Sequence, residues 1–286
     1  MPELLVELFS EEIPARMQKR ASDDLKRLVT QGLNSVGLEF SSCETYSTTR
    51  RLALVVNGVP EKQPTVREER RGPRSDAPEK AINGFKGSLP AGTVLEERET
   101  EKGIFLYGVV EKRGADTVSV MPCVIAETVR KLPWQKSMRW GTSDLRYVRP
   151  LLSILCVFNG RPILGESDIG SDVKLEFGGQ VFGHRFMAPN SFTVTSSHDY
   201  KQGLINAKVI LDPTERREKI ENDLIALAND ADLKIRTDPS LLDEVTGLVE
   251  WPVVLLGTID EEFMDVPDEV LITSMRSHQK YFSLLN

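Results

Sequence analysis

The sequence predicts an α+β protein with antiparallel or mixed sheets flanked by helices. Short apolar stretches of strand length are interspersed with amphipathic stretches of helix length, and glycine-containing turns join several strand candidates into hairpins. A strict alternation of strand and helix is missing, which argues against a parallel α/β fold. The 286 residues suffice for one large or two ordinary domains. We expect two regions, 1–150 and 151–286, the second truncated at its C-terminus.

The first region should open with a strand at 4–9 and a long helix that begins near Pro14 and ends at Gly37. A strand is expected at 48–56, followed by an exposed loop or arm over 60–78, which is rich in charge and proline. The remaining predicted elements are a helix at 78–88, a hairpin of 94–98 with 104–112 around Gly103, and a helix at 118–132.

The second region should begin with a hairpin of 151–158 and 162–166 around Asn159-Gly160, followed by several short strands up to Phe192. Asp212 and Pro213 are typical of a helix start, so a helix is expected at 213–227. Further predicted elements are a helix at 240–247, an apolar strand at 251–256, a helix at 267–279 and a strand that begins at 281.

Composition predicts a cytoplasmic protein that uses neither a membrane nor a disulfide framework. No apolar run approaches the roughly 18 residues of a membrane span, and acidic residues stand where a signal peptide carries positive charge. The three cysteines, at 43, 123 and 156, are far apart and odd in number. We expect all three to be buried thiols.

Charge is distributed unevenly along the chain. Residues 212–269 hold 17 acidic and 5 basic residues, a balance of −12, so the rest of the chain carries +5 of the total of −7. Residues 130–149 hold six basic residues and one acid. Such asymmetry can steer a polyanion to one face while the acidic face meets solvent or another protein.

Known catalytic and cofactor motifs are missing from the sequence. It has no GxxxxGK[ST], GxGxxG, HExxH or GxSxG, and its three histidines are not at metal-ligand spacing. A spatially assembled triad is not excluded by these patterns. We therefore expect no catalytic residues, no metal and no cofactor in this chain.

Arginines beside rigid backbone and aromatic residues are the candidate nucleic-acid contacts. Arg70, Arg71 and Arg74 surround Gly72-Pro73 and suit phosphate contact, or else they form a solvated loop neutralised by neighbouring glutamates. The stretch 136–149 interleaves cations with aromatics, as base stacking and backbone contact require. Alternatively, Trp134 and Trp140 belong to the core and the cations lie around it. Its candidate residues are Lys136, Arg139, Trp140, Arg146 and Arg149.

Two further candidate groups have equally ordinary explanations. Arg185 follows His184, which could be a hydrogen-bonded histidine at the edge of the core. Arg276, His278 and Lys280 lie near a predicted helix C-terminus, where the helix dipole alone favours cations.

Nine stretches, in order along the chain, resemble the beta subunit of the bacterial two-subunit glycyl-tRNA synthetase. They are ELLVELFSEEIP at 3–14, TTRRLAL at 48–54, RGP at 71–73, KSMRWG at 136–141, VRP at 148–150, GHRF at 183–186, DPTERR at 212–217, LVEWPVVL at 248–255 and LITSMRSHQKYF at 271–282. Their order and spacing cover essentially the whole chain.

The resemblance implies a role in translation, in an assembly of two alpha and two beta subunits. It implies that the alpha subunit holds the active site, with ATP and Mg, and that the beta subunit recognises tRNA(Gly), partly through a helical anticodon-binding region beyond residue 286. The partners expected here are therefore the alpha subunit and tRNA(Gly), with neither DNA nor membrane. The central part also looks similar to a domain of the phenylalanyl-tRNA synthetase beta subunit, an analogy of fold only.

Two other functions remain open at this point. One is an editing deacylase, although sieving by size removes only products smaller than the cognate one and no amino acid is smaller than glycine. The other is a structural scaffold for the alpha subunit that never touches RNA.

Overall fold

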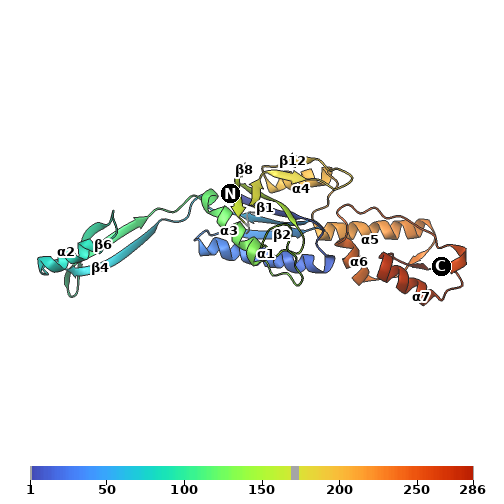
Figure 1. Ribbon diagram of the computed structural model, residues 1–286, viewed down its shortest axis with the longest axis horizontal. Coiled ribbons are helices and arrows are strands. Elements are labelled where there is room, and N and C mark those ends of the chain that lie inside the picture. Colours follow the sequence, from blue (N-terminus) through green and yellow to red (C-terminus); the bar gives the residue numbers. More distant parts are fainter. Residues whose placement is uncertain (1, 169–173, 286) are drawn as a thin grey trace.

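A central sheet carries a long arm at one end of the molecule and a mainly helical region at the other end (Figure 1). This arrangement is seen in a computed structural model that describes residues 2–168 and 174–285. The mixture of elements confirms the predicted α+β class. The predicted boundary at 150 directly precedes the strand β7, which pairs with β1, so both predicted regions contribute to one sheet.

Within the described residues, seven strands form the central sheet in the order β2-β3-β1-β7-β10-β9, with β8 beside β7. Neighbouring strands are antiparallel except for β7 and β10, which are parallel. The strands are β1 (Glu3–Ser10), β2 (Ser42–Ser47), β3 (Arg51–Asn57), β7 (Leu151–Phe158), β8 (Arg161–Pro162), β9 (Gly165–Asp168) and β10 (Lys174–Gly178). Strand β2 was not predicted from the sequence.

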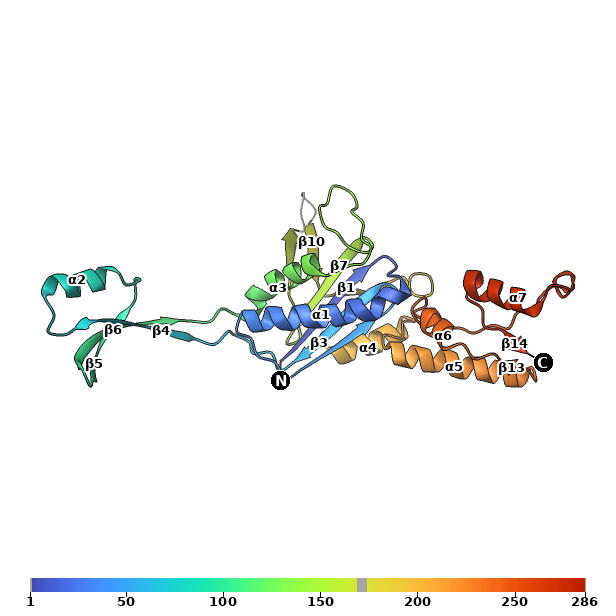
Figure 2. The same ribbon diagram turned by 90° about the horizontal axis from the view of Figure 1, so that it is seen from below.

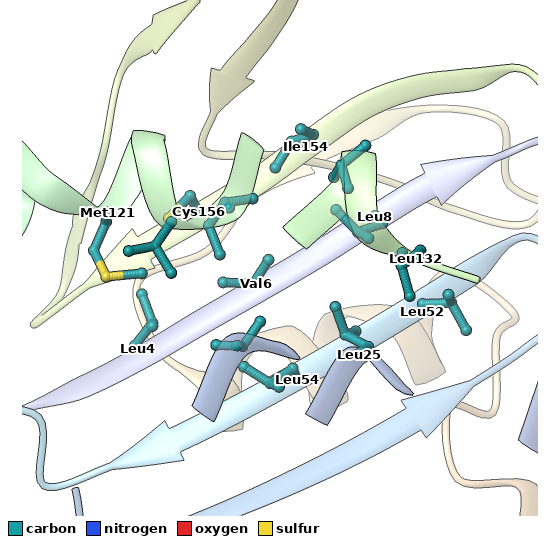
Figure 3. Close-up of a cluster of buried hydrophobic side chains, with 14 of the residues drawn as sticks. Leu4, Val6, Leu8, Leu25, Leu52, Leu54, Met121, Leu132, Ile154 and Cys156 are labelled. Atoms are coloured by element: carbon teal, nitrogen blue, oxygen red, sulfur yellow. The ribbon is translucent and has the colours of Figure 1, made fainter. Parts of the chain in front are cut away.

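Two helices, α1 (Ala15–Ser35) and α3 (Thr117–Lys131), cover one face of the sheet (Figure 2). Alternate residues of β1 and β3 point into this interface because side chains alternate between the faces of a strand. Figure 3 shows the resulting core. It includes Leu4, Val6, Leu8, Leu25, Leu52, Leu54, Met121, Leu132, Ile154 and Cys156.

The opposite face of the sheet is covered by α4 (Ser197–Asn206), a helix that the sequence analysis missed. Tyr200 and Leu204 of this helix pack on Leu5, Val55 and Val157. A two-stranded sheet of β11 (Gln180–Phe182) and β12 (Ser191–Thr193) adds to the same layer. Central strands are therefore buried on both faces, which accounts for their nearly continuous apolar sequences.

The arm is a three-stranded sheet with one helix, formed by β4 (Val66–Arg74), α2 (Glu79–Gly87), β5 (Val94–Thr100) and β6 (Gly103–Lys112). The predicted arm is present, but the interpretation of 60–78 as a loop was wrong for 66–74. This charged segment pairs with β6 from Val66 to Arg71 and again at Arg74, with an irregularity between them. Ion pairs between β4 and β5 here take the place of the apolar alternation that is typical of a predicted strand.

The last third contains α5 (Pro213–Asp230), α6 (Pro239–Thr246) and α7 (Asp268–Ser274). Asp212 caps α5 as predicted, because its carboxylate accepts a hydrogen bond from the Thr214 amide at 2.7 Å. The 3-10 turn Glu261–Phe263 precedes α7, and the π-helical turn Met275–Gln279 follows it. The last strands are short, β13 (Lys234–Ile235) and β14 (Leu284–Leu285), and the strand predicted at 251–256 is absent from the described structure.

Replacing Leu25 by alanine should remove about 2–5 kcal/mol from the free energy of unfolding, because this fully buried side chain fills the interface between α1 and the sheet. Urea unfolding of the variant measures the loss. Leu164→Ala is the matched control, since Leu164 is 74% exposed and its loss should cost less than about 0.5 kcal/mol. Equal losses for the two variants would contradict the described core.

Candidate nucleic-acid interface

A fully buried guanidinium, that of Arg51, joins four distant segments of the chain. It donates to Glu7 Oε2 at 3.1 Å, to Glu250 Oε1 at 2.9 Å and to the carbonyl of Gly183 at 3.2 Å. Tyr200 donates its hydroxyl to the same oxygen of Glu7. Burial alone would lower the pKa of Arg51, but the carboxylates of Glu7 and Glu250 outweigh burial and raise it above its ordinary value.

A second buried arginine, Arg216 of α5, binds only backbone carbonyls. It donates to the carbonyls of Ile210 at 2.6 Å, Leu211 at 2.9 Å, Ser47 at 2.8 Å and Thr246 at 3.3 Å. Burial lowers its pKa to about 10, so the group remains charged at neutral pH. This side chain fixes the start of α5 to the end of β2 and to α6. It is one of the contacts that attach the helical region to the sheet in a defined orientation.

The turn after β1 brings two of the predicted cations together. The amide of Glu11 donates to the carbonyl of Pro150 at 2.9 Å, which places the end of the basic stretch beside this turn. The Glu11 carboxylate lies 3.3 Å from Arg185 Nη1 and 3.6 Å from Arg50 Nη2. Arg185 also approaches Glu12, at 3.5 Å. Arg149 and Arg185 therefore lie near one turn although 36 residues separate them in the sequence.

Most of the predicted basic stretch is an exposed loop held by its aromatic residues. Met138 and Tyr147 pair through backbone hydrogen bonds of 2.8 and 3.2 Å, and the buried Tyr147 ring lies edge-on to Trp134 at 4.8 Å between centroids. Trp134 and Trp140 pack partly buried against the core. The tryptophans thus match the alternative that assigned them to the core, and base stacking by Trp140 stays a prediction.

The cations of this loop are exposed, and their carboxylate contacts are few. Arg139 lies 3.8 Å from Asp144, and Arg149 donates to the carbonyl of Val148 at 2.8 Å. For Lys136 and Arg146, the described part of the chain offers no ion-pair partner within 4 Å. Four solvated positive charges therefore project from a segment whose backbone is fixed, which is the arrangement that phosphate contact requires.

Helix α1 adds two arginines that the sequence analysis did not select. Arg16 and Arg20 line a small surface cleft together with Pro133, Trp134 and Gln135. Both are exposed, and Arg20 only approaches Asp24, at 3.8 Å. The available signal was their spacing of four residues on one helix face. We call the following six residues the basic surface: Arg16, Arg20, Lys136, Arg139, Arg146 and Arg149.

The arm arginines lie far from the basic surface, at one end of the molecule (Figure 1). Arg74 pairs with Asp76 at 3.1 Å, and the guanidinium of Arg71 lies over the Phe105 ring at 3.9 Å. Arg70 is exposed and reaches the carbonyl of Ser88 at 3.4 Å. Four further side chains form ion pairs of 2.6–3.2 Å, two along a strand and two between β4 and β5, and these are Arg67, Glu69, Glu96 and Arg98. Much of the arm's positive charge is therefore neutralised locally.

The third predicted group lies in the helical region, where it contacts α6. Arg276 pairs with Asp238 and donates to the Ser240 hydroxyl at 2.7 Å, and the bound guanidinium holds the pKa of Asp238 well below its usual range. Lys280 lies 3.0 Å from Glu244. His278 is exposed. Arg276 and Lys280 therefore attach the π-helical turn and the residue after it to α6.

In the described part of the chain, no three His, Cys, Asp or Glu side chains gather in a way that could hold a metal ion. None of the described helices is long and apolar enough to cross a membrane. The cysteines are free thiols, and Cys43 and Cys156 are buried as expected. The same expectation was wrong for Cys123, which is exposed on α3.

Comparison with known proteins assigns the chain to a class, the subunits of aminoacyl-tRNA synthetases. Residues 4–286 match the family model described as glycyl-tRNA synthetase beta subunit. The chain is 48% identical over 305 aligned residues to the glycine–tRNA ligase beta subunit of Rhodospirillum centenum, with 99% of this chain and 43% of that protein covered. The beta subunit of Cereibacter sphaeroides ATCC 17029 is 50% identical, with 100% and 41% covered.

The chain belongs to the glycyl-tRNA synthetase beta subunit family. It spans about two fifths of the length of these curated relatives. The resemblance inferred from nine short stretches is thereby confirmed. Four of those stretches contain the residues of the buried Arg51 network, which are Glu7, Arg51, Gly183 and Glu250. These four stretches therefore contribute to the stability of the fold.

Replacing Glu250 by alanine should cost about 3–5 kcal/mol of unfolding free energy, because it leaves the Arg51 guanidinium buried with one carboxylate fewer. Chemical denaturation measures this change. Glu127→Ala is the control, since Glu127 pairs with Lys131 at the exposed surface and should contribute less than about 1 kcal/mol. Arg51→Met added to Glu250→Ala should recover part of the loss, and a further additive loss would argue against the network.

Proposed function

We propose that this chain is the tRNA-positioning and assembly part of a glycine–tRNA ligase beta subunit. The RNA backbone lies on the basic surface, and glycyl transfer takes place on an alpha subunit, which supplies the ATP and Mg site. The observation that carries the proposal is the concentration of exposed, weakly paired cations on α1 and on the fixed loop 132–150. The family assignment and the names of the relatives support the choice of tRNA(Gly) over DNA as the polyanion. The setting of such an enzyme is the cytoplasm.

The physical role of such a surface is to fix the position of the tRNA. Cations that contact phosphates set the register of a nucleic acid without reading its sequence. Correct placement of the acceptor end matters because a reacting group held in the right geometry has a high effective concentration. Rigid support of the loop by Tyr147 and Trp134 favours this role, since a flexible loop would lose entropy on binding.

Arg185 and the arm arginines have a weaker claim to tRNA contact. Arg185 forms ion pairs with Glu11 and Glu12, and Arg74 forms one with Asp76. An RNA phosphate would have to displace a carboxylate at each of these positions. Arg70, Arg71, Arg276, His278 and Lys280 remain predicted contacts of lower priority because they lie outside the basic surface.

Charge reversal by Lys136→Glu with Arg146→Glu should weaken tRNA(Gly) binding and reduce its dependence on salt. Each lost phosphate contact should lower the slope of log affinity against log salt by about 0.7–0.9. Equilibrium binding over a salt series, with a non-cognate tRNA alongside, measures both effects. Lys219→Glu is the matched control because Lys219 pairs with Asp223 on the acidic helix α5.

The arm provides a second comparison in the same assay. Arg71→Glu with Arg74→Glu should change the slope less than the loop variant does, because both guanidiniums already have partners. A larger effect from the arm would move the RNA site to that end of the molecule. Unchanged binding for all folded variants would leave this chain as a scaffold for the alpha subunit and would reject the proposal.

A further inference from the structure

A strip of apolar side chains follows α6 on the surface of the helical region. Val253 is 62% exposed, Leu255 83% and Leu256 50%. Phe263 and Met264 continue the exposed apolar series toward α7. Single exposed apolar residues are ordinary, but a run of them marks an interaction site. We call residues 253–256, together with Phe263 and Met264, the apolar strip.

The strip has the sequence of a strand and no strand partner. Its first residues, VVLL, are of the type that favours strands, which is why the sequence predicts one at 251–256. In the described structure this segment forms no strand, and none of the amides of 253–259 donates to another backbone carbonyl. Unpaired backbone beside exposed apolar side chains is a template for the addition of a strand.

The charges around the strip exclude RNA as the molecule that covers it. Residues 260–269 carry six carboxylates and no basic residue. A phosphate backbone would be repelled by these carboxylates, whereas an apolar protein strand with basic residues at its end would be complementary. These charges therefore favour a protein over RNA as the occupant.

The curated relatives contain much more sequence than this chain does. The chain covers 41–43% of the length of the curated beta subunits that it matches, so more than half of each relative lies outside the match. The nearby sheet of β13 and β14 is also short, with two residues in each strand. An added strand could extend pairing in this region and cover the apolar side chains in one step.

We propose that the apolar strip pairs with a strand from the part of the beta subunit that this chain does not span. Pairing gives partners to the amides of 253–259 and removes Val253, Leu255 and Leu256 from solvent. The proposal rests on the family assignment and not on tRNA binding. Its failure would therefore leave the basic surface unaffected, and the failure of tRNA binding would leave the strip unaffected.

Hydrogen–deuterium exchange of the amides 253–259 tests the proposal in a full-length beta subunit and in the 286-residue chain. The amides should exchange at least tenfold more slowly in the full-length subunit, without any alpha subunit present. Leu255→Asp in the full-length subunit should restore fast exchange there while the amides of β1 stay protected. Leu164→Asp, at a similarly exposed leucine of the central body, should change neither.

Fast exchange at 253–259 in the full-length subunit would overturn the proposal. Protection that appears only after the alpha subunit is added would also overturn it, because the occupant would then belong to that subunit. Protection that survives Leu255→Asp would show that the strip is not the contact and would equally reject it.

Discussion

The arrangement of this molecule depends on one buried positive charge. Arg51 lies in the middle of four segments that are otherwise distant: β1 through Glu7, α4 through Tyr200, the turn at Gly183, and the segment after α6 through Glu250. A guanidinium deprived of water is tolerated only when its donors are matched by acceptors, so the four segments have to come together for any of them to be satisfied. The fold can therefore form only when these segments assemble around the guanidinium. Arg216 has the same effect, with backbone carbonyls as its acceptors.

That condition determines which cations remain available to a ligand. Arg51 and Arg216 are buried and already hydrogen-bonded within the protein. Arg50 and Arg185 form ion pairs with Glu11 at the turn after β1. In the arm, guanidiniums pair with carboxylates across the strands. Among the predicted sites, only the loop 132–150 presents exposed cations on a backbone that is itself fixed to the core, and α1 lies beside it with two more. What distinguishes the basic surface is therefore the lack of competing carboxylates and not the number of arginines in any stretch.

Local patterns in the sequence were sufficient to predict most helices and strands and to identify the family. They could not predict which charged side chains pair with one another. The helix start at Asp212, the Gly37 helix end and the Asn159-Gly160 turn depend on neighbouring residues, and each is present. Helix α4 was missed because its apolar contacts, Tyr200 and Leu204, are too few for a clear helical period. Arg51 was treated as part of a strand, since its partner Glu250 lies 199 residues away. The segment 251–256 was misassigned because an apolar sequence shows a preference for strands but cannot supply the partner strand.

The separation of charge along the molecule makes the proposed RNA contact and the proposed strand pairing compatible with each other. Salt screens charges beyond about 8 Å in physiological conditions, so a polyanion responds to the surface that it touches rather than to the net charge of −7. The carboxylates near the apolar strip lie in the helical region, whereas the basic surface is formed by α1 and a loop of the central body. Gln18 of α1 reaches the carbonyl of Gly247 at 2.6 Å, so α6 fixes the position of the helical region relative to α1. A partner strand on the strip and an RNA on the basic surface would then bind to different regions of one chain, the helical region and the central body, whose relative position is fixed by the hydrogen bonds of Gln18 and Arg216.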